Sequence, residues 1–287
     1  MGTEQESHRV AILGAGVMGT NIATLALGHG ATVVLVDVNE IVLDQARKTI
    51  RQKLRHARLM GALPDRPEGE LVTGASPRDA VGASVVIEAV TELPETKAKV
   101  LAEASAAVDP GTLIISNTSC IPIDEMAASV VRPADLVGVH FMNPPYLIKM
   151  VEVIRGVRTS DSTMESVLAL LSFLGREGLV VRDVPGFVIN RLLHPLINSA
   201  AMLVADGVAS AEVVDGLLEG CLGHSTGPLR TADLIGIDNL VDSLNVLYER
   251  TGDESCRPCG LMLQKVKEGS LGRKSGRGFY DYGKVVA

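Results

Sequence analysis

Two titratable residues in consecutive apolar runs of this sequence are suited to proton transfer. His140 lies near the end of residues 136–141, and Glu152 lies within residues 150–154. An imidazole that is oriented by a carboxylate can take a proton from an alcohol or return it. Among the six histidines, only His140 falls where a sheet strand is expected to end, and ligands bind beyond such ends. We therefore expect His140 to be a general base oriented by Glu152. The alternative is a hydrogen-bonded core histidine.

A glycine-rich segment directly follows the first apolar run and opens a helical pattern. It consists of Gly14, Ala15, Gly16, Val17, Met18 and Gly19. The first glycine permits a tight turn, the second lets the backbone approach a pyrophosphate, and the third allows close packing of helix on strand. The N–H groups of the helix N-terminus then face the anion.

Asp37 ends the second apolar run, close to the offset of ~20 residues at which an acid binds the ribose hydroxyls of a dinucleotide. A carboxylate there repels the 2′-phosphate of NADP, and Asn39 stands where an NADP enzyme often has arginine. The sequence therefore predicts NAD as the cofactor. The alternative is a glycine turn that only packs a helix on a sheet. That alternative does not explain why an acid stands at position 37.

The elements that position these residues alternate between strand and helix. Strands are expected at residues 9–13, 32–37, 84–89, 112–116, 136–141, 150–154 and 179–182. Helices are expected at residues 18–29, 95–107 and 162–174. Short continuous apolar runs are typical of strands buried on both faces, so the pattern predicts an α/β fold with a Rossmann-type, doubly wound and mostly parallel sheet.

The pattern changes near residue 184, after which the strand-like runs stop. Apolar residues at helical spacing predict a long helix from Ile189 to Leu203, kinked at Pro195, and further helices at residues 211–222 and 239–248. We therefore expect an NAD-binding Rossmann domain at residues 1–184. An all-α domain for substrate binding and dimerisation is expected at residues 185–287.

Composition argues against several other classes of protein. The net charge is 27 − 34 = −7, aromatic residues make up 3% and tryptophan is absent, which disfavours a nucleic-acid partner. No apolar run reaches the ~18 residues of a membrane span, and the polar start of the chain does not resemble a signal peptide. We expect a cytoplasmic protein without membrane attachment.

The cysteines do not indicate a metal or redox centre. The four are Cys120, Cys221, Cys256 and Cys259. Cys256 and Cys259 form a C-x-x-C, but it follows a polar loop rather than a strand, and no further ligands stand nearby to complete a zinc site. We expect a buried, apolar pair and no bound metal.

Together, in order, eight segments resemble the 3-hydroxyacyl-CoA dehydrogenase family over nearly the whole chain. They are residues 15–19, 88–92, 116–119, 138–144, 150–153, 185–191, 227–228 and 272–280. The resemblance implies an NAD-dependent oxidoreductase that interconverts a 3-hydroxyacyl thioester and its 3-oxo form. It also implies a homodimer whose helical domain closes over the cleft.

The resemblance also implies roles for individual residues. His140 is the base and Glu152 its partner, and Ser119 and Asn190 hydrogen-bond the substrate. Three further positions, Glu92, Lys97 and Asn143, line the nicotinamide half of the cofactor. Asn117 and Ser119 follow the strand at residues 112–116, at the same sheet edge, and we place both at the cofactor as well.

Basic residues crowd one expected helix of this acidic chain. Arg47, Lys48, Arg51 and Arg55 share a face with Arg58, and Lys53 lies on the same helix. The face is either simply solvated or binds the phosphates of CoA or the acidic surface of an acyl carrier protein. The chain is also similar to dehydrogenases of methoxymalonyl-type polyketide extender-unit pathways, which act on carrier-tethered glyceryl groups.

The sequence departs from the family pattern at two places, and three functions remain open. Ser225-Thr226 replaces the usual Pro-Met, and Cys120 replaces a second serine after Ser119. A polar Thr226 facing the acyl pocket would favour a short or hydroxylated acyl chain over a long one. The open functions are oxidation of a CoA thioester as in fatty acid metabolism, the same chemistry on a carrier protein in polyketide biosynthesis, and a non-catalytic NAD-binding protein. Hydroxyisobutyrate-type dehydrogenases are disfavoured, because their lysine-bearing helix after a glycine-rich stretch is missing.

Overall fold

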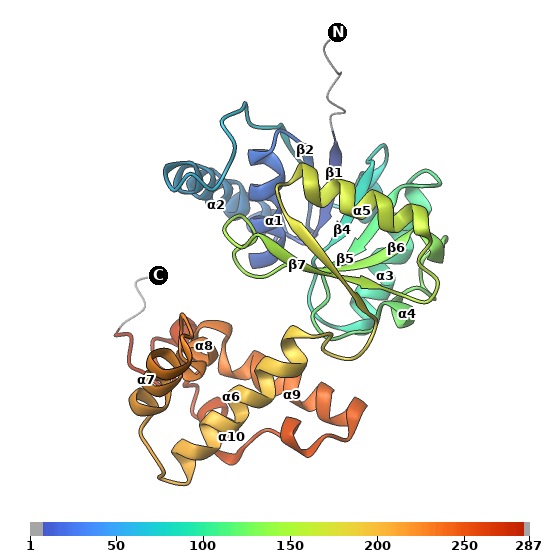
Figure 1. The fold of residues 1–287 in the computed structure, drawn as a ribbon. Helices are drawn as coiled ribbons and strands as arrows, with labels where there is room; N and C mark the ends of the chain where they lie inside the picture. The colour runs from blue at the N-terminus through green and yellow to red at the C-terminus, as the bar shows by residue number, and fades with distance from the viewer. Residues whose placement is uncertain (1–7, 284–287) are drawn as a thin grey trace. The chain divides into compact units, whose positions relative to one another are not determined.

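A computed structural model describes residues 8–283, which fall into two compact units that divide between Phe187 and Val188. The first unit is an α/β sandwich and the second consists of helices (Figure 1). The expectation of no signal peptide concerns residues 1–7 above all, and these lie outside the described part of the chain.

One eight-stranded sheet organises the first unit, in the order β3-β2-β1-β4-β5-β6-β7-β8. Its strands are β1 (Arg9–Leu13), β2 (Thr32–Val36), β3 (Leu71–Gly74), β4 (Val85–Glu88), β5 (Leu113–Ser116), β6 (Leu136–His140), β7 (Met150–Arg155) and β8 (Glu177–Arg182). Neighbouring strands pair in parallel except β6 and β7, which pair antiparallel. The predicted Rossmann-type, mostly parallel sheet is therefore confirmed.

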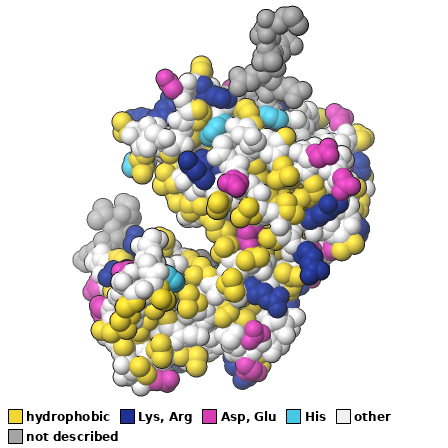
Figure 2. Space-filling model, in the orientation of Figure 1, with side chains coloured by type: hydrophobic (Ala, Val, Ile, Leu, Met, Phe, Trp, Pro, Cys, Tyr) yellow, Lys and Arg dark blue, Asp and Glu magenta, His cyan; other side chains and the backbone are white. Residues whose placement is uncertain are grey.

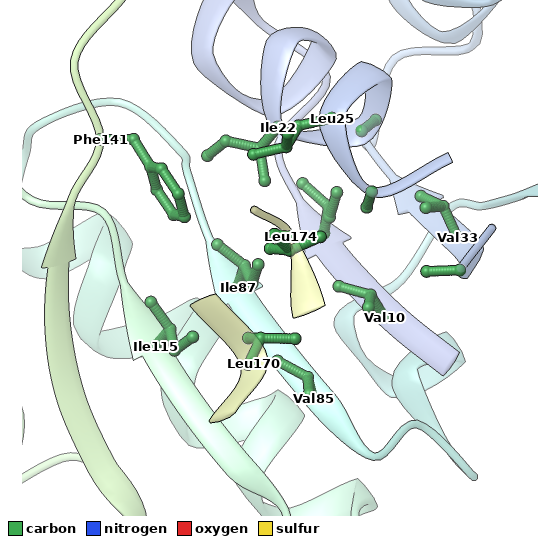
Figure 3. Close-up of a cluster of buried hydrophobic side chains, with 14 of the residues drawn as sticks. Val10, Ile22, Leu25, Val33, Val85, Ile87, Ile115, Phe141, Leu170 and Leu174 are labelled. Atoms are coloured by element: carbon green, nitrogen blue, oxygen red, sulfur yellow. The ribbon is translucent and has the colours of Figure 1, made fainter. Parts of the chain in front are cut away.

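Helices cover both faces of this sheet. They are α1 (Val17–Gly28), α2 (Glu40–Leu59), α3 (Pro94–Ala107), α4 (Ile123–Met126) and α5 (Asp161–Phe173). On one face, Ile22 and Leu25 of α1 meet Leu170 of α5 over the β-strand residues Ile87 and Ile115 (Figure 3). The apolar runs form strands because both faces of the central strands are buried in this way.

The chain reverses its direction of travel across the sheet between β1 and β4. From β1 it winds outward through β2 and β3, and then returns to place β4 on the other side of β1. The turn after β1 approaches the end of β4 so closely that a Cβ on Gly14 would lie 2.6 Å from the carbonyl oxygen of Ala89. Such a reversal opens a crevice at the carboxyl edge of the sheet, where ligands of doubly wound folds bind.

The second unit is all-α. Its helices are α6 (Ile189–Ala205), α7 (Ala211–Leu222), α8 (Pro228–Ile235), α9 (Ile237–Thr251) and α10 (Gly260–Lys267). They pack around a separate apolar core that includes Ile197, Leu229 and Leu244. Pro195 lies inside α6, which continues through it. None of the helices between residues 8 and 283 combines the length and apolar character needed to cross a bilayer.

The C-x-x-C segment is held by Asn198 of α6. The Asn198 amide nitrogen donates to the carbonyls of Ser255 and Arg257, and its oxygen accepts from the backbone N–H of Cys259. Cys256 is buried as expected, whereas Cys259 is only partly buried. Burial raises the pKa of both thiols, which keeps them protonated and unreactive. Within residues 8–283 no cluster of His, Cys, Asp and Glu is arranged to hold a metal ion.

Candidate active site

His140 and Glu152 face each other across the one antiparallel strand pair in the sheet. His140 is the last residue of β6 and is directly opposite Glu152 in the register with β7. The His140 Nδ1 atom lies 2.8 Å from Glu152 Oε2. Both residues are buried, at 8% and 7% exposure, so the contact is shielded from water. Phe187 packs on the imidazole with 5.9 Å between ring centroids.

This contact determines which imidazole nitrogen can act as a base. An ionised carboxylate can only accept, so with Glu152 ionised it is the His140 Nδ1 atom that carries the hydrogen and donates it. The neutral ring then has its lone pair on Nε2. A proton taken up at Nε2 creates an imidazolium whose charge the adjacent carboxylate stabilises.

The end of β5 supplies Asn117 and Ser119 at the same edge of the sheet. The Asn117 Oδ1 atom accepts from the backbone N–H of Phe141, the residue that follows His140. This bond ties the loop after β5 to the end of β6. Ser119 is half-buried, and its hydroxyl and its backbone N–H both donate to Glu92 Oε1, at 3.2 and 2.7 Å.

A buried ion-pair network lies beneath this loop. Lys97 of α3 is 1% exposed, and its Nζ lies 2.8 Å from Glu88 Oε1 and 3.1 Å from Glu92 Oε2. Glu88 ends β4, is fully buried, and also accepts from the Ser116 hydroxyl at 2.6 Å. Through Glu88, which contacts both Lys97 and Ser116, the ends of β4 and β5 are joined to the start of α3.

The network determines the charge of its members. Burial opposes ionisation of Glu92, but the Lys97 ammonium and hydrogen bonds from Thr118 and Ser119 outweigh it, and the pKa of Glu92 is lowered. Burial likewise disfavours charged Lys97, but Glu88 and Glu92 together outweigh it, so its pKa is raised. Glu92 is thus held as a carboxylate near the surface, where its side chain is 36% exposed.

The glycine-rich loop has room for a dinucleotide pyrophosphate. Gly14 adopts a φ of +103°, which disfavours any residue with a Cβ, and a Cβ on Gly16 would meet no protein atom within 4 Å. Gly19 packs so tightly that its Cβ would lie 1.8 Å from the Gly14 carbonyl oxygen. α1 begins after Gly16 with no side-chain cap and no acid in its first turn, so its N–H groups suit an anion.

Asp37 connects this loop to the ribose position. Its two carboxylate oxygens accept from the backbone N–H groups of Ala15 and Asn39, each at 2.9 Å. A cavity of about 340 Å³ lies between Asp37 and the ends of β1 and β4, with apolar walls that include Val42 and Val90. Carboxylate, glycine loop and apolar walls fit the ribose, pyrophosphate and adenine of NAD. Asn39 itself caps α2 by accepting from Ile41 N–H.

The remaining predicted site residues lie in three places. Asn143 is exposed in the loop after β6, and its Oδ1 accepts from Asn21 of α1 at 2.7 Å. Asn190 is 8% exposed in the first turn of α6, in the second unit. On α2, the residues Arg47, Lys48, Arg51 and Arg55 are exposed, opposite a buried apolar stripe. Arg47 is paired with Asp44 at 3.0 Å and donates to Thr73.

Three further polar residues were not predicted as part of the site: Glu88 at the end of β4, Asn21 of α1 and Lys53 of α2, whose Nζ donates to Asn21. Glu88 is the last residue of an apolar run, and a carboxylate in that position is a signal for a buried partner. Asn21 is the one amide in an otherwise apolar and small-residue helix, which is a similar signal.

Two family models and several known proteins are similar to this chain. Residues 9–184 match the family model described as the 3-hydroxyacyl-CoA dehydrogenase NAD binding domain, and residues 186–282 match the C-terminal domain of that family. A probable 3-hydroxybutyryl-CoA dehydrogenase of Deinococcus radiodurans is 39% identical, over 94% of this chain and 99% of that protein. One from Bacillus subtilis is also 39% identical, over 96% of this chain and 98% of that protein.

Among solved structures, an (S)-3-hydroxybutyryl-CoA dehydrogenase from Ralstonia eutropha superposes with a TM-score of 0.88 at 36% identity, covering 97% of this chain and 100% of that one. Fold, cofactor loop and sequence relationship define an NAD-dependent dehydrogenase. More narrowly, the chain belongs to the 3-hydroxyacyl-CoA dehydrogenase family.

The carboxylate of Asp37 is expected to select NAD over NADP. In Asp37→Asn the side chain keeps its size but loses the charge that repels a 2′-phosphate, so the ratio of kcat/KM for NAD to that for NADP should fall about tenfold or more. Initial rates with each cofactor measure the ratio. Asp65→Asn, which alters an exposed carboxylate outside the cavity, is the control. An unchanged ratio would contradict the assignment.

Proposed function

We propose that this enzyme interconverts a 3-hydroxyacyl thioester and its 3-oxo form, with His140 as general base and acid. The observation that carries the proposal is the 2.8 Å contact of buried His140 with buried Glu152 at the edge of the sheet that bears the NAD loop. When bound, NAD supplies the hydride acceptor for oxidation, and its reduced form supplies the donor for reduction.

In the direction of oxidation, His140 Nε2 takes the proton of the 3-hydroxyl as the C3–H bond breaks, with its electron pair leaving as hydride. Glu152 keeps the Nδ1 hydrogen in place and stabilises the imidazolium that forms. In the direction of reduction, the imidazolium returns the proton to the oxygen at C3. Burial of the pair strengthens this charge interaction and excludes water.

Two further roles belong to the proposal. Ser119 and Asn190 hydrogen-bond the substrate, and Glu92, Lys97, Asn117 and Asn143 border the nicotinamide half of NAD. Support for Ser119 and Glu92 comes from the carboxyl edge they share, where Glu92 is held charged and Ser119 is half-buried. Lys97 acts there through its ion pairs, since its ammonium is buried against Glu88 and Glu92.

The names of the relatives favour a short acyl chain on CoA, since they act on 3-hydroxybutyryl-CoA by name. The exposed, polar Thr226 is compatible with a short or hydroxylated chain. The decisive experiment is a pair of assays, with NADH and NADPH, on acetoacetyl-CoA and on the same acyl group tethered to an acyl carrier protein. NADH-dependent turnover of acetoacetyl-CoA supports the proposal, and no turnover of either thioester would contradict it.

A carrier-tethered substrate, such as the glyceryl group of polyketide extender units, is the second candidate. It is favoured by the exposed cations Lys48, Arg51 and Arg55 on one helix of a chain with net charge −7. A carrier protein presents acidic residues around its phosphopantetheine arm, and CoA presents phosphates; both suit this helix face. A higher kcat/KM for the tethered substrate would select this candidate.

Reversing two charges on this face of α2 tests whether the face binds the CoA or carrier-protein part of the thioester. The double variant Arg51→Glu, Arg55→Glu should raise the KM for the preferred thioester about tenfold at low salt while kcat stays near that of the unaltered protein. Both side chains are exposed, so the fold should be unaffected. The KM for NADH serves as the internal control. An unchanged thioester KM would mean that the face is only solvated.

We propose that the helical unit forms a homodimer. Large apolar side chains are exposed along α6 and α7, among them Leu192, Leu196, Leu203, Leu217 and Leu222. Figure 2 shows hydrophobic atoms exposed over this part of the helical unit. A second copy of the chain would bury such a surface. A non-catalytic NAD-binding role is disfavoured, because a protein that only bound NAD would have no use for the His140–Glu152 pair.

A further inference from the structure

Lys53 lies on α2 but differs from the exposed cations of that helix. It is half-buried, and its Nζ donates to Asn21 Oδ1 of α1 at 2.5 Å. Partial burial lowers the pKa of Lys53, as expected for an ammonium removed from bulk water. Its neighbours Arg51 and Arg55 are exposed. Lys53 therefore does not belong to the exposed basic face that is proposed to bind CoA or a carrier protein.

Asn21 continues the contact from α1 to the loop after His140. It is 2% exposed, and its Nδ2 donates to Asn143 Oδ1 at 2.7 Å. A buried amide is costly unless both of its ends are bonded, and here each end bonds to a different element. Lys53, Asn21 and Asn143 thus form a hydrogen-bonded relay from α2 through α1 to the loop that follows β6.

The lysine determines how the side-chain amides of Asn21 and Asn143 are oriented. An ammonium only donates, so the atom of Asn21 that faces it must be the carbonyl oxygen, and the other end of that amide is the NH₂ group. The NH₂ group only donates, so the atom of Asn143 that faces it must again be the oxygen. The NH₂ group of Asn143 is thereby turned away from α1, as a hydrogen-bond donor on an exposed side chain.

We propose that Lys53 and Asn21 are positioning residues that hold the Asn143 amide with its NH₂ group directed away from α1, toward the nicotinamide half of a bound NAD. The inference rests on the proposed function in that Asn143 borders the nicotinamide. An exposed amide without the relay rotates freely about its last bond. Fixing it before the cofactor arrives removes an entropic cost from binding.

The test is Asn21→Asp, with NADH binding followed by fluorescence. The new carboxylate pairs with Lys53 but cannot donate to Asn143, whose NH₂ group should rotate toward it and away from the cofactor. The Kd for NADH should rise about five- to tenfold, the scale of one lost hydrogen bond. A purely structural role for Asn21 predicts no such loss, because the contact to Lys53 becomes a salt bridge.

Three single variants and one double variant in an Asn143→Ala background complete the experiment. Lys53→Met removes the donor that orients Asn21 and should weaken NADH binding about two- to fivefold. Lys53→Arg keeps a side chain that only donates, and it should bind NADH like the unaltered protein. Lys99→Met makes the same charge change at an exposed lysine of α3 and should leave the Kd unchanged. In a protein that already carries Asn143→Ala, Asn21→Asp should have no further effect on the Kd.

The measured Kd values for NADH distinguish a positioning role of Asn21 from a purely structural one. Weaker NADH binding in Asn21→Asp that disappears in the Asn143→Ala background supports the relay. A Kd for Asn21→Asp within about twofold of the unaltered protein, or an effect that persists without the Asn143 amide, overturns it. Because the readout is NADH binding, a protein that binds NADH but turns over no thioester would contradict the proposed function instead.

Discussion

Replacing His140 with alanine is expected to lower kcat about 10²- to 10⁴-fold, the usual contribution of a positioned general base. The variant removes the atom, Nε2, that takes the hydroxyl proton, and it leaves Glu152 without its 2.8 Å partner. The glycine loop and Asp37 involve other residues, so the Kd for NADH should remain close to that of the unaltered protein. Initial rates of thioester reduction and an NADH titration measure the two quantities separately.

The exposed His56 of α2 provides the matched control, since His56→Ala removes an imidazole from the surface and should leave kcat unchanged. Glu152→Gln should give a smaller loss of kcat than His140→Ala. The amide can still accept from Nδ1, but it no longer offers a charge to the imidazolium. A Glu152→Gln protein with undiminished kcat would mean that Glu152 does not stabilise that charge.

Replacing Lys97 with methionine is expected to destabilise the protein by about 3–5 kcal/mol, because it strands a buried carboxylate. Glu88 is fully buried, and the Lys97 ammonium 2.8 Å away is its partner of opposite charge. The Met side chain fills a similar volume, so the loss reports on charge rather than on a cavity. Urea unfolding gives the change in the free energy of unfolding.

Lys99→Met, two positions along the same helix and exposed, is the control and should change stability little. Adding Glu88→Gln to Lys97→Met should recover part of the loss, because the stranded charge is then gone. A loss below about 1 kcal/mol in Lys97→Met, the size of a surface pair, would contradict the picture of a buried network.

The pKa shifts in this network indicate when it stabilises the fold. The pKa of Lys97 is raised in the folded state, so its contribution is complete below the ordinary lysine pKa and is lost as pH rises through the raised value. The pKa of Glu92 is lowered, so its contribution is present above the ordinary glutamate pKa and is lost as pH falls through the lowered value. Between these limits Lys97 and Glu92 both stay charged.

The central strands and long helices were predictable because each has its own hydrophobic pattern within a short stretch of sequence. β1, with all but its first residue buried, is a continuous apolar run, and α2 carries a buried stripe at helical spacing. β3 was missed because it is a partly buried edge strand of only four residues. The short helices α8 and α10 were also missed, although Pro228 at the first turn of α8 is a recognisable start signal.

The site was predictable where chemistry follows from residue type and strand end, as with Gly14, Asp37 and His140. The partners of buried polar groups were harder, because they are chosen by packing between distant elements. Lys97 meets Glu88 only because α3 packs beside β4, and Lys53 meets Asn21 only because α2 lies against α1. The local pattern places Lys53 among the other cations of α2 and does not distinguish it from them.

The most direct test of the account measures NADH-dependent reduction of acetoacetyl-CoA by the unaltered protein and by His140→Ala, together with NADH binding to both. We expect rapid turnover by the unaltered protein, a kcat at least about 10²-fold lower in His140→Ala, and the same Kd for NADH in each. Turnover by His140→Ala at the rate of the unaltered protein would contradict the role of His140, since another group would then be moving the proton.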